Sequence, residues 1–76
     1  MKEFVETIIK ALVDNPEAVV LNEIEGERTT VFEVRVGPGD MGKVIGKGGQ
    51  TAKAIRTIIM AISAKKGKRA QLEILE

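Results

Sequence analysis

The amino-acid sequence predicts an α+β domain in which helices pack on one face of a three-stranded mixed sheet. Segments with the helical spacing of apolar residues and segments with two-residue alternation follow one another in the order α-β-β-α-α-β. The connection between the second and third strands is long enough to cross the sheet, so these strands should run parallel if they are neighbours. The 76 residues suffice for one domain, residues 1–76, and 43% of them are apolar, which makes a single core feasible.

The first half of the chain predicts one helix and a hairpin. A helix is expected over residues 2–13, and Pro16 follows its end. The apolar side chains at helical spacing in this segment are Phe4, Val5, Ile8, Ile9 and Leu12. Residues 18–25, rich in branched side chains, and residues 29–36, in which apolar and charged residues alternate, predict two strands joined by a turn at Gly26.

The second half predicts two helices and a strand. A short helix is expected over residues 41–45, with Asp40 as its N-terminal cap. A break at Gly46–Gly49 separates it from a longer helix over residues 50–66, and Gly67 stands where a left-handed C-terminal cap belongs. The inner face of the long helix is expected to carry Ala52, Ile55, Ile58, Ile59 and Ile62. A last strand follows, whose alternating apolar residues are Ala70, Leu72 and Ile74.

Basic side chains are concentrated in one part of the chain. Residues 41–70 contain eight Lys and Arg and no acid, whereas residues 1–40 contain four basic and nine acidic side chains. This asymmetry is typical of a face presented to an anion, but it is equally typical of a solvated helix with basic residues at its C-terminal end. Charge alone does not decide between the two.

The composition argues against several classes of protein. The chain has no Cys and no His, which excludes thiolate and imidazole metal sites and histidine-based proton transfer. We therefore expect no enzymatic activity, no metal and no cofactor. The longest apolar run, residues 58–62, is far shorter than the roughly 20 residues that span a bilayer, and Glu3 and Glu6 argue against a signal peptide. The sequence predicts a cytoplasmic protein without a membrane partner.

Two glycine motifs compete for a functional interpretation. Residues 37–42 follow a strand and have the spacing G-x-G-x-x-G, which is typical of dinucleotide-binding loops. The chain is too short for a doubly wound sheet, the next helix breaks at Gly46, and no acidic residue ends a second strand about 20 residues further on. Residues 37–42 are therefore interpreted as a connection between a strand and a helix.

The second motif, within residues 44–55, places glycines between two helices. Small residues allow a phosphodiester backbone to approach the main chain, and the free N–H groups of the next helix face the same place. Lys47 adds a mobile cation at the tip, and Lys43 and Lys53 lie within a turn or two. A plain corner between helices and a DNA-reading helix-turn-helix are the alternatives. The second is weakened by the few base-reading side chains on the following helix, which are Gln50, Lys53 and Arg56.

The segment V-I-G-K-G-G-x-x-x-x-x-I, residues 44–55, resembles the signature of KH domains, and the element order resembles their prokaryotic, type II arrangement. In length and in the segments DNPEAV and GKGGQTAKAIR, the chain is similar to the KhpA family of small bacterial RNA-binding proteins. The resemblance covers the whole chain. It implies a type II KH domain that binds single-stranded RNA, with a G-x-x-G loop clamping the backbone of about four nucleotides.

Carried onto this chain, the resemblance assigns the clamp to a loop formed by Gly46, Lys47, Gly48 and Gly49. It also implies an aliphatic groove floor for the bases, with candidates Val36, Val44, Ile45 and Ile55. Three cations are added from their charge and helical spacing, namely Lys43, Lys53 and Arg56. A plain core position is the alternative for Val44 and Ile55, and a solvated surface position is the alternative for the three cations.

The resemblance further implies an RNA chaperone or post-transcriptional regulator that acts as a homodimer or with a larger KH-containing protein. Single-stranded DNA is a second candidate ligand. The alternative function is an assembly module in which pairing dominates and RNA binding is secondary, because the acidic N-terminal half could meet a basic surface. The only aromatic residues, Phe4 and Phe32, are expected on apolar faces, so RNA affinity should depend on phosphate contacts and on salt.

Overall fold

The computed structural model describes all of residues 1–76. The predicted order of helices and strands is confirmed. The elements are α1 (Lys2–Leu12), the 3-10 turn η1 (Pro16–Ala18), β1 (Val20–Glu25), β2 (Thr29–Arg35), α2 (Met41–Ile45), the 3-10 turn η2 (Lys47–Gly49), α3 (Gln50–Ala64) and β3 (Arg69–Ile74). No helix is long and apolar enough to cross a membrane.

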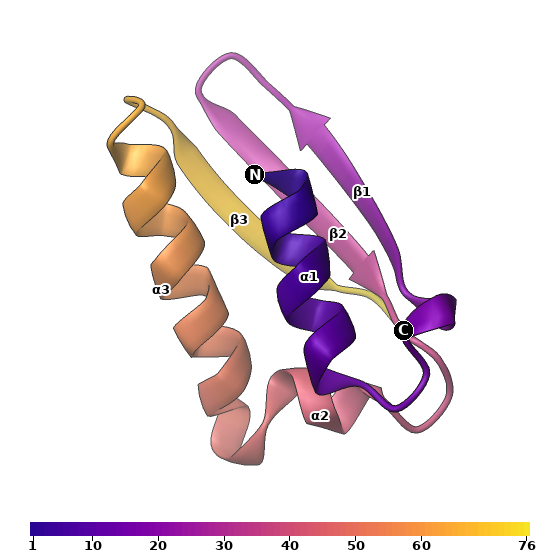
Figure 1. The fold of residues 1–76 in the computed structure, drawn as a ribbon. Helices are drawn as coiled ribbons and strands as arrows, with labels where there is room; N and C mark the ends of the chain where they lie inside the picture. Colours follow the sequence, from indigo (N-terminus) through magenta and orange to yellow (C-terminus); the bar gives the residue numbers. More distant parts are fainter.

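The three strands form one mixed sheet in the order β1-β2-β3. β1 runs antiparallel to β2, and β3 runs parallel to β2, as the long crossover through α2 and α3 predicts. Figure 1 shows α1 and α3 side by side on the same face of this sheet, which confirms the predicted layering. The opposite face has no helix over it.

The core lies between the two long helices and the central strand. Phe32 and Val34 of β2 project into it, and Ile9 of α1 and Ile59 of α3 are fully buried against them. The buried apolar cluster comprises Val5, Ile9, Val13, Val19, Leu21, Phe32, Val34, Val44, Ile55, Ile59, Ala70 and Leu72. Because Val44 and Ile55 belong to this cluster, the two helices that flank the glycine loop are anchored in the same core as the sheet.

The predicted burial of two apolar helix residues is wrong. Ile58 is 44% exposed and Phe4 is 43% exposed. An α-helix turns about 100° per residue, so each helix presents only a narrow stripe to a flat sheet. On α3 that stripe consists of Ala52, Ile55, Ile59 and Ser63. On α1 it is centred on Val5 and Ile9, which leaves Phe4 at its edge.

Two boundaries differ from the prediction by two residues. β1 begins at Val20 rather than Ala18, because Pro16–Ala18 forms a 3-10 turn before it. α3 ends at Ala64, two residues before the predicted end, although Gly67 has the expected left-handed conformation with φ +71°.

Candidate nucleic-acid interface

Gly46 fixes the point at which the chain leaves α2. Its backbone has φ 76° and ψ 173°, a region essentially restricted to glycine. Its N–H donates to the Gly42 carbonyl at 2.8 Å, and its carbonyl accepts from the Gly49 N–H at 3.1 Å. A Cβ atom here would lie 2.6 Å from Thr51 Cβ and 2.9 Å from Thr51 N, so α3 passes too close for any side chain. The entry to the loop therefore has one shape, and that shape requires glycine.

The tip of the loop is open. Lys47 and Gly48 are exposed, and a Cβ atom on Gly48 would meet nothing within 4 Å. The Lys47 ammonium makes no hydrogen bond or ion pair within the chain. α3 begins at Gln50, immediately after the tip, so its positive dipole end lies beside Lys47, although the Gln50 N–H already donates to the Lys47 carbonyl. The tip therefore combines room for close approach with positive charge, which suits a phosphate group.

Asp40 holds α2 against the end of α1. It occupies the N-cap position of α2, but its side chain makes no capping hydrogen bond, so the predicted capping role is wrong. Its carboxylate instead accepts from the backbone N–H groups of Asp14 at 3.2 Å and Asn15 at 3.0 Å. Asp40 is only 3% exposed. The buried carboxylate satisfies two main-chain donors beyond the end of α1 and thereby fixes the helix from which the loop departs.

Lys43 is directed toward this same contact. Its ammonium lies 3.2 Å from an Asp14 carboxylate oxygen and 3.8 Å from Asp40 Oδ1. Two carboxylates beside Lys43 lower the net positive charge at this position, whereas Lys47 has no acidic side chain within ion-pair distance. Of the two lysines nearest the loop, Lys47 is free and Lys43 is engaged.

The four predicted floor residues separate into two kinds. Val44 is 0% exposed and Ile55 is 4% exposed, so both are core residues, the alternative given above for these two positions. Ile45 and Val36 are partly buried, and Val36 packs on the core from the end of β2. Only Ile45 and Val36 retain surface that could belong to a binding face.

The two cations predicted on α3 also differ. Lys53 is exposed and its ammonium has no partner. Arg56 donates from Nε to the Leu72 carbonyl on β3 at 3.2 Å. The N–H groups of Arg69 and Leu75 donate to the carbonyls of Arg28 and Val34, on the β2 side of β3. Successive residues of a strand direct their hydrogen-bonding groups to alternate sides, so the Leu72 carbonyl points to the free edge of the sheet. Arg56 thus lies across the edge of β3 with its terminal N–H groups still available.

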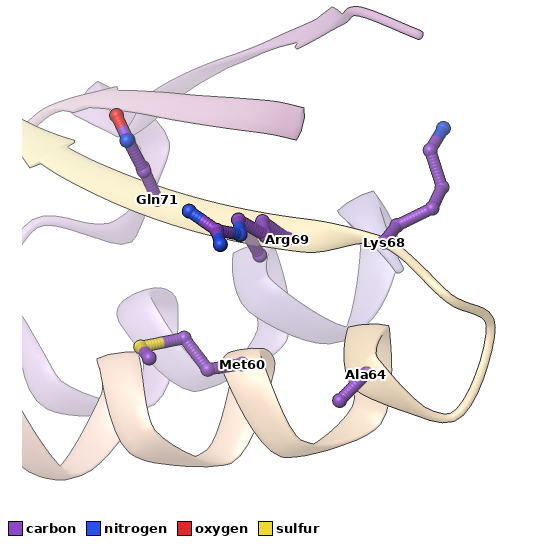
Figure 2. Close-up of a pocket in the computed structure, with 6 residues that line it drawn as sticks. Met60, Ala64, Lys68, Arg69 and Gln71 are labelled. Carbon is purple, nitrogen blue, oxygen red and sulfur yellow. The ribbon is translucent and has the colours of Figure 1, made fainter. Parts of the chain in front are cut away.

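A groove between α3 and β3 was missed from the sequence. A hollow of ≈ 370 Å³ is lined by Met60, Ala64, Lys68, Arg69, Ala70 and Gln71. Figure 2 shows Met60 and Ala64 on the helix and Arg69 and Gln71 on the strand, while Lys68 points away from Met60. An adjoining hollow is lined by Arg56, Met60, Ala70, Gln71, Leu72 and Glu73. Met60, 54% exposed, is the largest apolar surface in this groove. The exposure of Met60 could not be predicted from the sequence, because almost every residue in this part of the helix is apolar or small.

The eight basic residues of the acid-free segment do not form one face. Lys43, Lys47 and Lys53 lie at the loop end of α3, Arg56 lies in the middle part of α3, and Lys65, Lys66, Lys68 and Arg69 lie at its other end. Lys68 pairs with Glu25 of β1 at 2.8 Å. This hydrogen bond and the charge of Lys68 hold the pKa of the Glu25 carboxyl below its usual value. Most of the basic side chains therefore gather in two regions separated by the length of α3, and they do not form the single face considered from the sequence.

Comparison with known proteins gives the chain its family. The family model described as "KhpA/KhpB, KH domain" matches residues 2–74. The protein named RNA-binding protein KhpA from Aquifex aeolicus is 57% identical over 76 residues, which cover 100% of this chain and 96% of that protein. The proteins of the same name from Caldanaerobacter subterraneus and Clostridium perfringens are 55% and 53% identical, each over 99% of this chain and 100% of their own length.

No solved structure gives a significant match to the chain. The family match nevertheless extends over both long helices, all three strands and the whole glycine loop. The resemblance deduced from the loop motif and from the element order is confirmed, and the chain belongs to the KhpA/KhpB family of KH domains.

Proposed function

We infer that this protein binds single-stranded RNA through the loop Gly46–Gly49. The observation that carries the inference is the geometry of the loop, whose open tip presents the uncompensated Lys47 beside the positive dipole end of α3. The names of the relatives support the choice of ligand, since each is called an RNA-binding protein. A phosphate at the tip accepts hydrogen bonds from main-chain N–H groups and an ion pair from Lys47.

The bases extend from the loop along α3 into the groove beside β3. Met60 supplies an apolar floor, and Arg56, fixed by its bond to the Leu72 carbonyl, supplies a guanidinium plane at the near end. Ile45 and Val36 border the approach from the other side of the loop. No aromatic side chain lines the groove, so stacking adds little and phosphate contacts supply most of the affinity.

The test compares three proteins on a labelled single-stranded RNA of randomised sequence over a series of salt concentrations. The variant Lys47→Asp, Gly48→Asp places two carboxylates at the tip, and Lys47→Asn, Gly48→Asn is its uncharged counterpart of the same shape. We expect affinity to fall in the order wild type, Asn variant, Asp variant, with the Asp variant at least about tenfold weaker than wild type because it repels phosphate.

Circular dichroism establishes whether the variants fold, which the open space around Gly48 favours. Both variants carry the same left-handed strain at residue 48, so any difference between them reports charge and not shape. Equal affinity of all three proteins would overturn the assignment of the loop. Preference for single-stranded DNA over RNA in the same assay would overturn the choice of ligand.

Pairing of two KH domains is the second part of this proposal. The protein acts as a dimer with itself or with a larger KH-containing protein, and it serves as an RNA chaperone or post-transcriptional regulator in the cytoplasm. Three exposed apolar side chains favour a protein contact, namely Val20 and Ile24 on the open face of the sheet and Ile58 on α3. Light scattering across a dilution series tests self-association, and a mass equal to one chain at every concentration would leave only the heteromeric form.

The assembly alternative predicts the same oligomeric state for the loop variants but a different loss of function. If pairing is the main role and RNA is incidental, the variant Lys47→Asp, Gly48→Asp should retain its oligomeric state and should still replace the wild-type protein in cells. We expect it instead to keep its oligomeric state and lose its effect on RNA annealing. An annealing assay with complementary RNA strands separates the two functions.

A further inference from the structure

β1 is an edge strand whose outer side has no neighbour. The strand order β1-β2-β3 places it opposite β3, and Figure 1 shows it as the outer strand on the side away from α3. The Gly26 N–H donates to the Thr29 carbonyl on the β2 side, and successive residues direct their main-chain groups to alternate sides. Leu21, Glu23 and Glu25 therefore point outward, and no main-chain hydrogen bond from a loop or turn reaches them. This edge can accept a further strand.

The chain around this edge is acidic. Residues 11–27 contain five acids and no Lys or Arg, which is the reverse of the charge in residues 41–70. Glu25 is already paired with Lys68, whereas the Glu23 carboxylate makes no ion pair or hydrogen bond within the chain. The edge of β1 therefore repels phosphate groups and attracts cationic side chains.

The two faces of β1 differ in chemistry. Leu21 is buried against the helices, so Val20 and Ile24 lie on the opposite, open face of the sheet, where both are exposed. Ile24 is in register with Val31 of β2, which continues the apolar surface across the open face. Glu23 is on the helix face with Leu21. A strand added beside β1 would therefore have apolar neighbours on one face and acidic neighbours on the other.

A hollow of ≈ 90 Å³ lies on the helix face beside this edge. It is lined by Glu23 and by the hydroxyl residues Thr30 and Ser63. Each hydroxyl residue is only 7% exposed, and neither side chain makes a hydrogen bond within the chain. Lys66 and Lys68 also line the hollow, and Lys68 is already paired. The hollow thus offers a free carboxylate and two unused hydroxyl groups to a long side chain that enters from the edge.

We propose that the free edge of β1 pairs with an extended segment of a partner protein in which apolar residues alternate with Lys or Arg. The main-chain groups of Leu21, Glu23 and Glu25 form the hydrogen bonds of the added strand. Its apolar side chains pack beside Val20 and Ile24, and its basic side chains lie beside the acids of the helix face. One of these basic side chains donates to Glu23 at the hollow.

A second copy of this chain fits the edge less well than a basic segment does. Antiparallel pairing of two β1 strands about Glu23 would place this carboxylate opposite the same carboxylate of the other copy, and like charges directly opposite are destabilising. The edge of β1 also lies on the other side of the sheet from the groove beside β3. The proposal therefore does not depend on how the protein binds RNA.

The first experiment uses a fluorescein-labelled synthetic peptide in which valine and lysine alternate. A control peptide has the same composition, with its valines and lysines in separate blocks. We expect fluorescence anisotropy to show at least about tenfold tighter binding of the alternating peptide, because only this pattern places apolar and basic side chains on opposite faces of a strand. Equal affinities for the two peptides would overturn the proposal, because charge alone would then be sufficient.

Hydrogen exchange measured by NMR locates the contact. The alternating peptide should slow exchange of the outward N–H groups of Leu21, Glu23 and Glu25 and leave those of Ala70 and Leu72, on the free edge of β3, unchanged. Slowed exchange at β3 instead, or at neither edge, would overturn the proposal. Slowed exchange at β1 without peptide, increasing with protein concentration, would assign the edge to a second copy and overturn the choice of partner.

Variants at one position separate main-chain pairing from charge. Glu23→Pro removes an outward N–H without removing a hydrogen bond to β2, so it should weaken peptide binding at least about tenfold. Glu23→Gln retains the N–H and should weaken binding about threefold. Glu73→Gln, the matched control on β3, should change affinity less than about twofold. Circular dichroism verifies the fold of each variant, and equal effects of Glu23→Gln and Glu73→Gln would overturn the assigned edge.

A competition experiment separates this site from the RNA-binding surface. An excess of single-stranded RNA should not displace the labelled peptide, because the two ligands have opposite charge and are assigned to different parts of the sheet. Displacement of the peptide by RNA would overturn a separate peptide site. Failure of the variant Lys47→Asp, Gly48→Asp to lose RNA affinity would affect only the loop assignment, since that assay contains no peptide.

Discussion

The two ends of α3 carry similar charge but are built differently. At the loop end, Gly46 packs against Thr51 and the preceding helix is tied to α1 by the buried Asp40. At the other end, Gly67 also has a positive φ, but a Cβ atom there would meet nothing within 4 Å, and the one ion pair, Lys68 with Glu25, is exposed. One end has a required shape, and the other has charge without a required shape.

This difference shows that positive charge and a binding geometry are separate properties of the molecule. The loop end has fewer free cations than its sequence suggests, since Lys43 is engaged by two acids. Its capacity to bind phosphate depends on main-chain geometry. The turn end has the larger cluster of cations. It can attract phosphate groups electrostatically, but its main chain forms no binding site of defined shape.

The largest difference in stability between the two ends is expected when alanine replaces Gly46 or Gly67, both of which have a positive φ. Gly46→Ala forces a Cβ atom against the backbone of Thr51 and a conformation nearly restricted to glycine, so it should lower the free energy of unfolding by about 3 kcal/mol or more. Gly67→Ala meets only the conformational penalty and should cost about 1 kcal/mol. Urea denaturation measures both, and equal losses would show that the loop end has no special constraint.

The polar contacts of the two ends should differ next most. Asp40→Ala leaves the N–H groups of Asp14 and Asn15 without their acceptor and should cost about 2–3 kcal/mol of unfolding free energy. Asp40→Asn keeps one acceptor oxygen and should cost less. Glu25→Gln, which removes the exposed ion pair at the other end, should give no measurable change. A loss from Glu25→Gln as large as that from Asp40→Ala would contradict the contrast.

The two lysines beside the loop should contribute unequally to RNA binding. Lys47→Gln removes a free cation and should weaken binding about fivefold at low salt, with a salt slope flatter by about 0.7. Lys43→Gln removes a cation already held by Asp14 and Asp40, so affinity should change less than about twofold. Fluorescence titrations of the two variants decide this, and the reverse order would mean that Lys43 leaves its acidic partners when RNA binds.

The smallest effect is a titration. Lys68 lowers the pKa of Glu25, so the folded state favours the ionised carboxylate. A depressed carboxyl pKa adds stability above the unfolded value and loses it as the pH falls through the folded value, which places the loss below about pH 4.5. NMR titration should find the pKa of Glu25 below its ordinary value in wild type and higher in Lys68→Gln. An unchanged pKa in that variant would assign the shift to another cause.

The sequence was sufficient for the order of elements, the parallel pairing of β3 and the position of the loop, because each depends on local pattern and chain connectivity. Long-range contacts were not predictable. Asp40 looks like a helix cap because caps are recognised from the next few residues, yet its acceptors are used by Asp14 and Asn15 far back in the chain. The engagement of Lys43 depends on the same tertiary contact.

The faces of the long helix were harder to predict for a different reason. Residues 58–62 are all apolar, so periodicity cannot say which of them a flat sheet will cover. The structure buries Ile59 and exposes Ile58 and Met60, and the exposed Met60 becomes part of the groove.

The hydrogen bond from Arg56 to the Leu72 carbonyl also affects the tendency of the protein to aggregate through its sheet edge. β3 is an edge strand, and its outward N–H and C=O groups would accept a further strand from another chain. A guanidinium lying across that edge occupies one of the acceptors and places a charge where an incoming strand would have to pair. Arg56 therefore also opposes edge-to-edge aggregation of the sheet. Its replacement by a short apolar residue should lower solubility as well as weaken RNA binding.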